Sequence, residues 1–201
     1  MVTNLARDRI LAEAGDLFVA HGASGVTMRG LAARIGVTPM ALYRHFDSRE
    51  ALLRAVVEEG HSTFLGYLSR ALAEPTPEAR FLQSGLEYLA FALDHPRKYA
   101  VMFMEHVPKV DGEDATQQWL DVATFRFLVD RIRDCQAASA LAAGDPEALG
   151  LTVWAHVHGL VSLFLAGKIC VDREAFEAIY RNSIAVLARG FGWCGDGAAS
   201  G

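Results

Sequence analysis

The chain has 201 residues, of which 52% are hydrophobic and 21% are charged. This composition excludes a disordered protein, because there are enough apolar side chains to bury a core. The net charge of −5 also excludes a protein that coats nucleic acid without selectivity. The charge is unevenly divided: residues 1–50 carry +1 and the remainder carries −6, which favours contact with DNA at one end of the chain only.

The first predicted helix runs from about Asn4 to Ala20, and Gly22 lies beyond its end. Its apolar residues recur at helical spacing. They are Ile10, Leu11, Ala14, Leu17 and Phe18. This apolar face predicts packing against the helices that follow.

Residues 27–46 are predicted to form two short helices joined by a tight turn. Thr27 is placed to cap the first helix, Gly36 gives the backbone freedom that the turn needs, and Val37 is expected to fill the space beneath it. Thr38 and Pro39 supply an N-cap and a proline at the first position of the second helix. The apolar faces consist of Met28, Leu31, Ala32 and Ile35, then Leu42, Tyr43 and Phe46.

Ala32, Gly36 and Leu42 have the spacing of a helix-turn-helix motif. The outward face of the second helix has no acidic residue before Asp47. A helix that enters the major groove needs such a face, because phosphates flank the groove on both sides. A helical hairpin buried in an ordinary all-α domain can show the same short pattern. The local pattern therefore leaves both interpretations open.

The segment from Ile10 to Val57 resembles the DNA-binding domain of the TetR family of bacterial transcriptional regulators. The matching residues are Ala14, Leu17, Phe18, Gly22, Val26, Thr27, Leu31, Ala32, Gly36, Val37, Leu42, Tyr43, His45, Phe46, Ser48, Glu50 and Leu52. The family usually has lysine where this chain has Arg49, and both cations are able to hold a phosphate. The resemblance implies a DNA-binding head followed by a helical domain that binds an effector and dimerises.

The resemblance also implies a set of DNA-binding residues around the turn. They are Thr27, Arg29, Thr38, Met40, Ala41, Tyr43, Arg44, His45 and Arg49. Phosphates would be held by Thr38, Tyr43 and Arg49. Arg29 would reach a base edge or a phosphate. The side chains that face the groove would be those of Met40, Ala41, Arg44 and His45. Two alternatives stay open: the Tyr43 ring packs in the core, and His45 has a partly buried structural role.

From Asp47 onward the pattern predicts helices and no strands. A long helix capped by Ser48 ends before Pro75, and a last helix is capped by Asp172. Between them we expect helices over about 77–95, 96–106, 115–138 and 145–168, with a loop at 107–114. The architecture is all-α with about nine helices: a three-helix DNA-binding domain (1–48), a helical effector-binding and dimerisation domain (49–191) and a flexible tail (192–201).

The segment from Ala148 to Gly167 contains no Asp, Glu, Lys or Arg and is about as long as a membrane span. It also contains two histidines and two internal glycines, which favour a helix buried by packing on both sides. Cys135, Cys170 and Cys194 are an odd number without metal-ligand spacing, and the first ten residues include no apolar run. These features favour a reduced bacterial cytoplasm.

The last two predicted helices are the candidate dimer interface. Small residues there permit close approach and apolar ones fill a four-helix contact. The residues expected in it are Gly159, Leu160, Leu163, Phe164, Gly167, Ile179 and Leu187. The stretch from Trp154 to Leu160 further resembles the Trp–His–Gly motif of one C-terminal subclass of the family.

The family also implies an apolar effector cavity. The expected lining residues are Phe64, Tyr88, Met102, Phe103, Trp119, Phe125, Trp154 and His158. Trp154 and His158 share a helix face at i, i+4, so His158 is a candidate to orient a ligand. A hydrogen-bonded histidine at the subunit interface is the alternative.

Catalysis is not expected. His156 and His158 point to nearly opposite sides of a helix, and the chain has no glycine-rich phosphate loop and no nucleophile elbow. We therefore expect no catalytic or metal site and no cofactor. The sequence predicts a homodimeric, effector-responsive regulator of double-stranded operator DNA, most simply a repressor. An activator of the same fold and an all-α interaction protein that does not bind DNA stay open.

Overall fold

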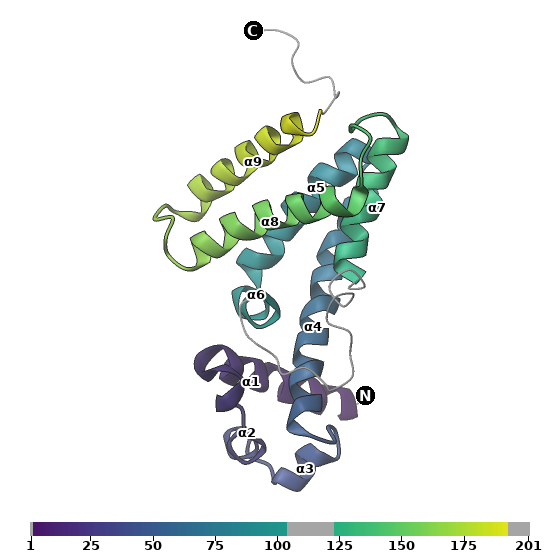
Figure 1. Ribbon diagram of the computed structural model, residues 1–201. Coiled ribbons are helices and arrows are strands. Elements are labelled where there is room, and N and C mark those ends of the chain that lie inside the picture. The colour runs from purple at the N-terminus through teal and green to yellow at the C-terminus, as the bar shows by residue number, and fades with distance from the viewer. Residues whose placement is uncertain (1, 104–122, 193–201) are drawn as a thin grey trace. The chain divides into compact units, whose positions relative to one another are not determined.

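The structure is a computed structural model that describes residues 2–103 and 123–192, and every regular element in these ranges is helical (Figure 1). The elements are α1 (Val2–Gly25), α2 (Met28–Ile35), α3 (Pro39–Tyr43), α4 (Arg49–Ser69), the 3-10 helix η1 (Arg70–Ala73), α5 (Pro77–Asp94), α6 (Pro96–Phe103), α7 (Ala123–Ala137), α8 (Pro146–Leu165) and α9 (Arg173–Gly190). The all-α prediction is confirmed. The expectations for Trp119, Cys194, the loop at 107–114 and the tail beyond Gly192 lie outside the described residues.

The chain divides into two compact units. One contains Met1–Thr63 and His95–Asp114, and the other contains Phe64–Asp94 and Ala115–Gly201. The division therefore passes within α4, which contributes residues to both units. The boundary expected near residue 48 marks the end of the predicted DNA-binding domain. It is a different boundary from the division into compact units, and it stays a prediction.

In the first unit, α2 and α3 are capped by the residues that the sequence predicts. The Thr27 hydroxyl oxygen accepts a hydrogen bond from the Gly30 amide at 3.1 Å, and the Thr38 hydroxyl oxygen accepts one from the Ala41 amide at 3.3 Å. Gly36 follows α2 with φ of +76°, in the left-handed region that favours glycine. These local contacts fix the turn between α2 and α3.

The hydrophobic core of the first unit packs against the inner faces of α2 and α3. Leu11, Phe18, Leu31 and Leu42 are fully buried there. Val37, by contrast, is 43% exposed, so the expectation that it fills the space beneath the turn is wrong. The Val37 amide closes the turn instead, donating to the Ala32 carbonyl at 3.0 Å.

In the second unit, α5 packs against η1, α7, α8 and α9. Part of the core there is built from Phe81, Ile132, Leu141 and Val153. Cys135 lies in the same cluster, and burial raises the pKa of its thiol to about 12, so the thiol stays protonated.

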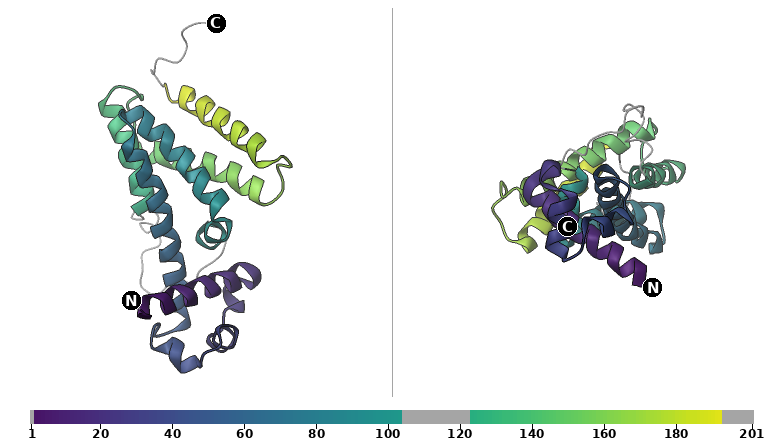
Figure 2. Two further views of the ribbon diagram at one scale, coloured as in Figure 1. Left: turned by 180° about the vertical axis from the view of Figure 1, so that it is seen from behind. Right: turned by 90° about the horizontal axis from the view of Figure 1, so that it is seen from below.

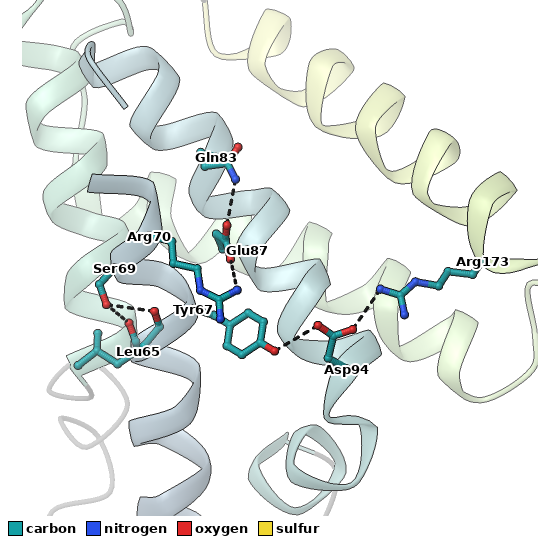
Figure 3. A network of polar contacts seen from close by, with 9 residues as sticks. Leu65, Tyr67, Ser69, Arg70, Gln83, Glu87, Asp94 and Arg173 are labelled. Carbon is teal, nitrogen blue, oxygen red and sulfur yellow. Dashed lines mark hydrogen bonds and ion pairs between the residues drawn. The ribbon is translucent and has the colours of Figure 1, made fainter. Parts of the chain in front are cut away.

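A polar network joins the end of α4 and η1 to α5 and α9 (Figure 3). The buried carboxylate of Glu87 pairs with Arg70 at 3.4 Å, and the Arg70 guanidinium lies over the Tyr67 ring, 3.9 Å from its centroid. The Tyr67 hydroxyl donates to Asp94 at 3.1 Å, and Arg173 at the start of α9 pairs with the same carboxylate at 3.1 Å. These contacts set where α9 begins relative to α5.

The apolar helix α8 forms a hairpin with α9, and both views show the two helices side by side (Figures 1 and 2). By length and composition α8 is able to cross a membrane. Of its most apolar window, 22% is buried against the described residues. Its buried residues are Gly150, Val153, Val157 and Val161. Among the residues that the structure describes, one face of α8 is uncovered, so the expectation of burial on both sides is wrong for this part of the chain.

Candidate nucleic-acid interface

The residues expected to contact DNA gather on the outer surface of α2 and α3. Thr27, Arg29, Thr38, Met40 and Arg44 are exposed. Ala41 and His45 are half-buried. No carboxylate lies on α3 or in the turn that follows it until Asp47. A surface of this kind is able to approach phosphates without repulsion from acidic groups.

The Tyr43 side chain is not part of the core. Tyr43 is 46% exposed, whereas its neighbour Leu42 is fully buried. The phenol therefore stands at the surface next to Arg44, where a hydroxyl is able to donate to a phosphate oxygen. For His45, half-burial leaves both a base contact and a structural role open.

Arg49 has partners within its own unit. Its Nε donates to the Val26 carbonyl at 2.6 Å, and an Nη group donates to the Ala23 carbonyl. The other Nη group pairs with Glu50 at 3.2 Å, and the side chain is only 27% exposed. The guanidinium thus holds the end of α1 and the residue that follows it against the start of α4. We therefore regard Arg49 as a positioning residue for the motif rather than as a direct phosphate ligand.

Replacing Arg49 by alanine is expected to lower the free energy of unfolding by about 1–3 kcal/mol, because two backbone carbonyls lose a charged donor. Arg49→Lys should recover only part of the loss, since an ammonium lacks the fork that reaches both carbonyls. Urea denaturation followed by circular dichroism measures both changes. Arg44→Ala is the control, because Arg44 is exposed and its loss should change stability by less than about 0.5 kcal/mol. Equal stability of all the variants would contradict this role for Arg49.

A further basic side chain near α3 was not among the expected DNA-binding residues. The Arg7 guanidinium on α1 lies over the Phe46 ring, 5.4 Å from its centroid. Arg9, two residues further along α1, donates to the Ile35 carbonyl at 3.4 Å. The excess of arginine over acid in residues 1–50 was the available signal. Only the packing of α1 shows which of these arginines lie near α2 and α3.

The second unit brings together most of the residues expected to line an effector site. Tyr88 is buried, and its hydroxyl lies 3.2 Å from His158 Nδ1. His158 Nε2 lies 3.3 Å from the Ser162 hydroxyl, and the Trp154 ring is 6.1 Å from the imidazole. Burial lowers the pKa of His158, which favours the neutral imidazole beside these two hydroxyls. Phe64 packs edge-on against Tyr88 at a centroid separation of 5.3 Å.

The remaining expected effector residues are distributed differently. Phe125 lies 6.0 Å from Trp154, between ring centroids, and so joins the cluster in the second unit. Met102 and Phe103 belong to the first unit, where Met102 lies against Gly60 and Phe103 lies 6.2 Å from His61, between ring centroids. The structure therefore supports a cluster of Phe64, Tyr88, Phe125, Trp154 and His158.

Some of the residues expected at the dimer interface are exposed, and others pack inside the second unit. Leu163 is 48% exposed and Ile179 is 41% exposed, and Gly167 is exposed in the turn after α8. Phe164, in contrast, stacks on Phe176 of α9 with ring centroids 4.0 Å apart. Leu187 packs against the core cluster of the second unit. These last two side chains help to hold the hairpin together.

Two exposed apolar residues of the hairpin were not among those expected. Leu151 is 42% exposed and Val186 is 53% exposed. Leu151 lies near the start of α8, and Val186 lies near the end of α9. The lack of acidic and basic residues on α8 after Glu147 was the available signal for Leu151.

Two family profiles match this chain. Residues 10–56 match the bacterial regulatory proteins of the tetR family, and residues 81–187 match the tetracyclin repressor-like C-terminal domain. The second match lies on α5–α9, and the first covers α1–α3 and the start of α4. The further resemblance of Trp154–Leu160 to the Trp–His–Gly subclass stays a prediction.

Several bacterial proteins are similar in sequence. An uncharacterised HTH-type transcriptional regulator of Mycobacterium tuberculosis is 34% identical over 114 residues, 56% of each chain, so the chain spans about half the length of this relative. A second uncharacterised regulator of that organism is 25% identical over 186 residues, covering 92% of this chain and 81% of its own. The regulator UidR of Escherichia coli is 25% identical over 145 residues, covering 65% of this chain and 66% of its own.

Solved structures share the fold. A protein of unknown function from Rhodococcus sp. RHA1 superposes with a TM-score of 0.75 and 29% identity over 92% of this chain and 94% of its own. A tetR-family regulatory protein from Rhodococcus RHA1 gives a TM-score of 0.77 with 22% identity over 94% of this chain and 98% of its own. Members of this family are transcriptional regulators and not enzymes. With both halves matched, the chain belongs to the TetR family of bacterial regulatory proteins.

Proposed function

We propose that this regulator is a cytoplasmic repressor that binds a palindromic operator as a homodimer and is released by a small apolar or aromatic effector. The observation that carries the proposal is the outer surface of α3. This surface is exposed and has no carboxylate before Asp47, and the buried side chain of Leu42 anchors the opposite face of α3. The segment 1–48 would be the DNA-binding domain, and residues 49–191 would bind the effector and dimerise.

The proposed homodimer is supported by the uncovered face of the α8–α9 hairpin. Leu151, Leu163, Ile179 and Val186 are all more than two-fifths exposed, and α8 carries no charged side chain after Glu147. A second copy packing on this face would bury the apolar residues in a four-helix contact. Two short recognition helices would then reach half-sites about one helical turn apart, or a multiple of it, along the operator.

The proposed effector site is the aromatic cluster around His158. Tyr88 and Ser162 hydroxyls flank the imidazole, so a ligand there would meet aromatic rings and a small polar group, as small-molecule sites commonly offer. Ligand binding would shift α4, which runs from the DNA-binding segment to Phe64 in this cluster. A preference for the non-binding form of about 1–3 kcal/mol would weaken operator binding about 5–150-fold.

Substitutions on α3 should separate phosphate contacts from base contacts. Tyr43→Phe is expected to weaken binding to all duplexes about equally, because a phosphate contact carries no sequence information. Arg44→Ala is expected to relax the preference at particular base pairs by about 1–3 kcal/mol. The operator is first selected from a random duplex pool, and gel-shift titrations at several salt concentrations then compare it with scrambled DNA.

Wild-type protein that binds no duplex at low salt would contradict the proposed function and favour an interaction protein of the same fold. Unchanged operator affinity in both variants, with binding intact, would instead show that another surface contacts DNA. An activator is distinguished from a repressor by the position of the operator relative to the promoter that it controls.

A further inference from the structure

Met40 is the most exposed large hydrophobic residue among those that the structure describes. Its side chain is 67% exposed, against 43% for Val37 and 46% for Tyr43 nearby. Exposing so long an apolar side chain to water is unfavourable, and among the described residues Met40 lies outside the hydrophobic core of the first unit. Its position on α3 therefore indicates a contact that forms only with a partner.

The neighbours of Met40 are also apolar. The first turn of α3 consists of Pro39, Met40 and Ala41. None of these side chains has a hydrogen-bond donor, and their one acceptor is the weak thioether sulfur of Met40. The Thr38 hydroxyl oxygen accepts from the Ala41 amide at the N-terminal end of α3, and its O–H is expected to donate to a phosphate. Hydrogen-bonding side chains begin only with Tyr43 and Arg44, one turn further along. Pro39, Met40 and Ala41 therefore offer a base edge no side-chain donor and no strong acceptor.

Base edges in the major groove present one apolar feature, the methyl group of thymine. The other edges present donors and acceptors that an apolar side chain would leave without partners. Methionine suits a methyl contact because its thioether chain is unbranched, flexible and polarisable. We infer that Met40 packs against a thymine methyl group in each half-site of the operator. This inference rests on the proposed function, since it concerns the same surface.

Deoxyuridine tests the contact directly, because it pairs as thymine does and lacks only the methyl group. Each thymine of the selected operator is replaced by deoxyuridine in both half-sites, and the affinity for each duplex is measured by gel-shift titration. For the wild type, one such position should lower affinity about fourfold per half-site, or about fifteenfold for both. For Met40→Ala the same replacement should change affinity less than about twofold, and Met40→Leu should keep most of the dependence.

Leu72→Ala is the matched control, since Leu72 is 47% exposed on η1 in the other unit and should keep the wild-type response. An operator that is bound but insensitive to every deoxyuridine replacement overturns this inference alone. So does a dependence that survives in Met40→Ala, because another residue then reads the methyl group. Absence of binding to any duplex overturns the proposed function and this inference with it.

Discussion

Replacing Leu163 by glutamate should convert the protein to monomers and lower its operator affinity by about 10²- to 10⁴-fold. Leu163 is 48% exposed, so the single chain has room for the carboxylate. In the proposed four-helix contact the charge would be buried without a partner, which strongly disfavours association. Loss of the second DNA-binding unit removes the gain that comes from linking two half-site contacts.

Sedimentation equilibrium measures the subunit association, and gel-shift titration measures the operator affinity. Leu72→Glu is the matched control, because Leu72 is 47% exposed and lies on η1, outside the α8–α9 face. Circular dichroism should report the same helix content and melting behaviour for both variants. A Leu163→Glu protein that stays dimeric would place the interface on another surface.

The second large effect is expected for Leu42→Ala, which should lower the free energy of unfolding by about 2–5 kcal/mol. Leu42 is the fully buried residue of α3, and it belongs to the core that also contains Leu31 and Phe18. Truncation leaves a cavity in this core, and the turn before α3 is too short to move far enough to fill it. Operator affinity should fall as well, because the exposed face of α3 is held in place by this one buried side chain.

Urea denaturation followed by circular dichroism, together with titration of the selected operator, measures both consequences. Val37→Ala provides the comparison: Val37 is 43% exposed, and its truncation should change stability by less than about 0.5 kcal/mol. If Val37→Ala were as damaging as Leu42→Ala, the valine would lie beneath the turn after all, and the packing described here would be incorrect.

The sequence by itself determined the helices and the turn, and it predicted the DNA-binding surface. Thr27, Gly36 and Thr38 act on amides or dihedral angles within three residues of themselves, so their effect is visible in the sequence. The apolar periodicity of α2 likewise reports its buried face, which consists of Met28, Leu31, Ala32 and Ile35. Local hydrogen bonds and local periodicity were sufficient for these features.

The tertiary structure decided which partners the long side chains have. Arg49 donates to carbonyls 23 and 26 residues earlier in the chain, and Phe164 stacks on a ring in the next helix. Val37 and Leu42 are both apolar, yet one is exposed and the other is buried. Burial and pairing depend on elements that are distant in the sequence, and helical spacing states only which face a residue occupies. For that reason the chain alone predicted the fold and the surface, whereas the role of each arginine and each aromatic ring required the packed structure.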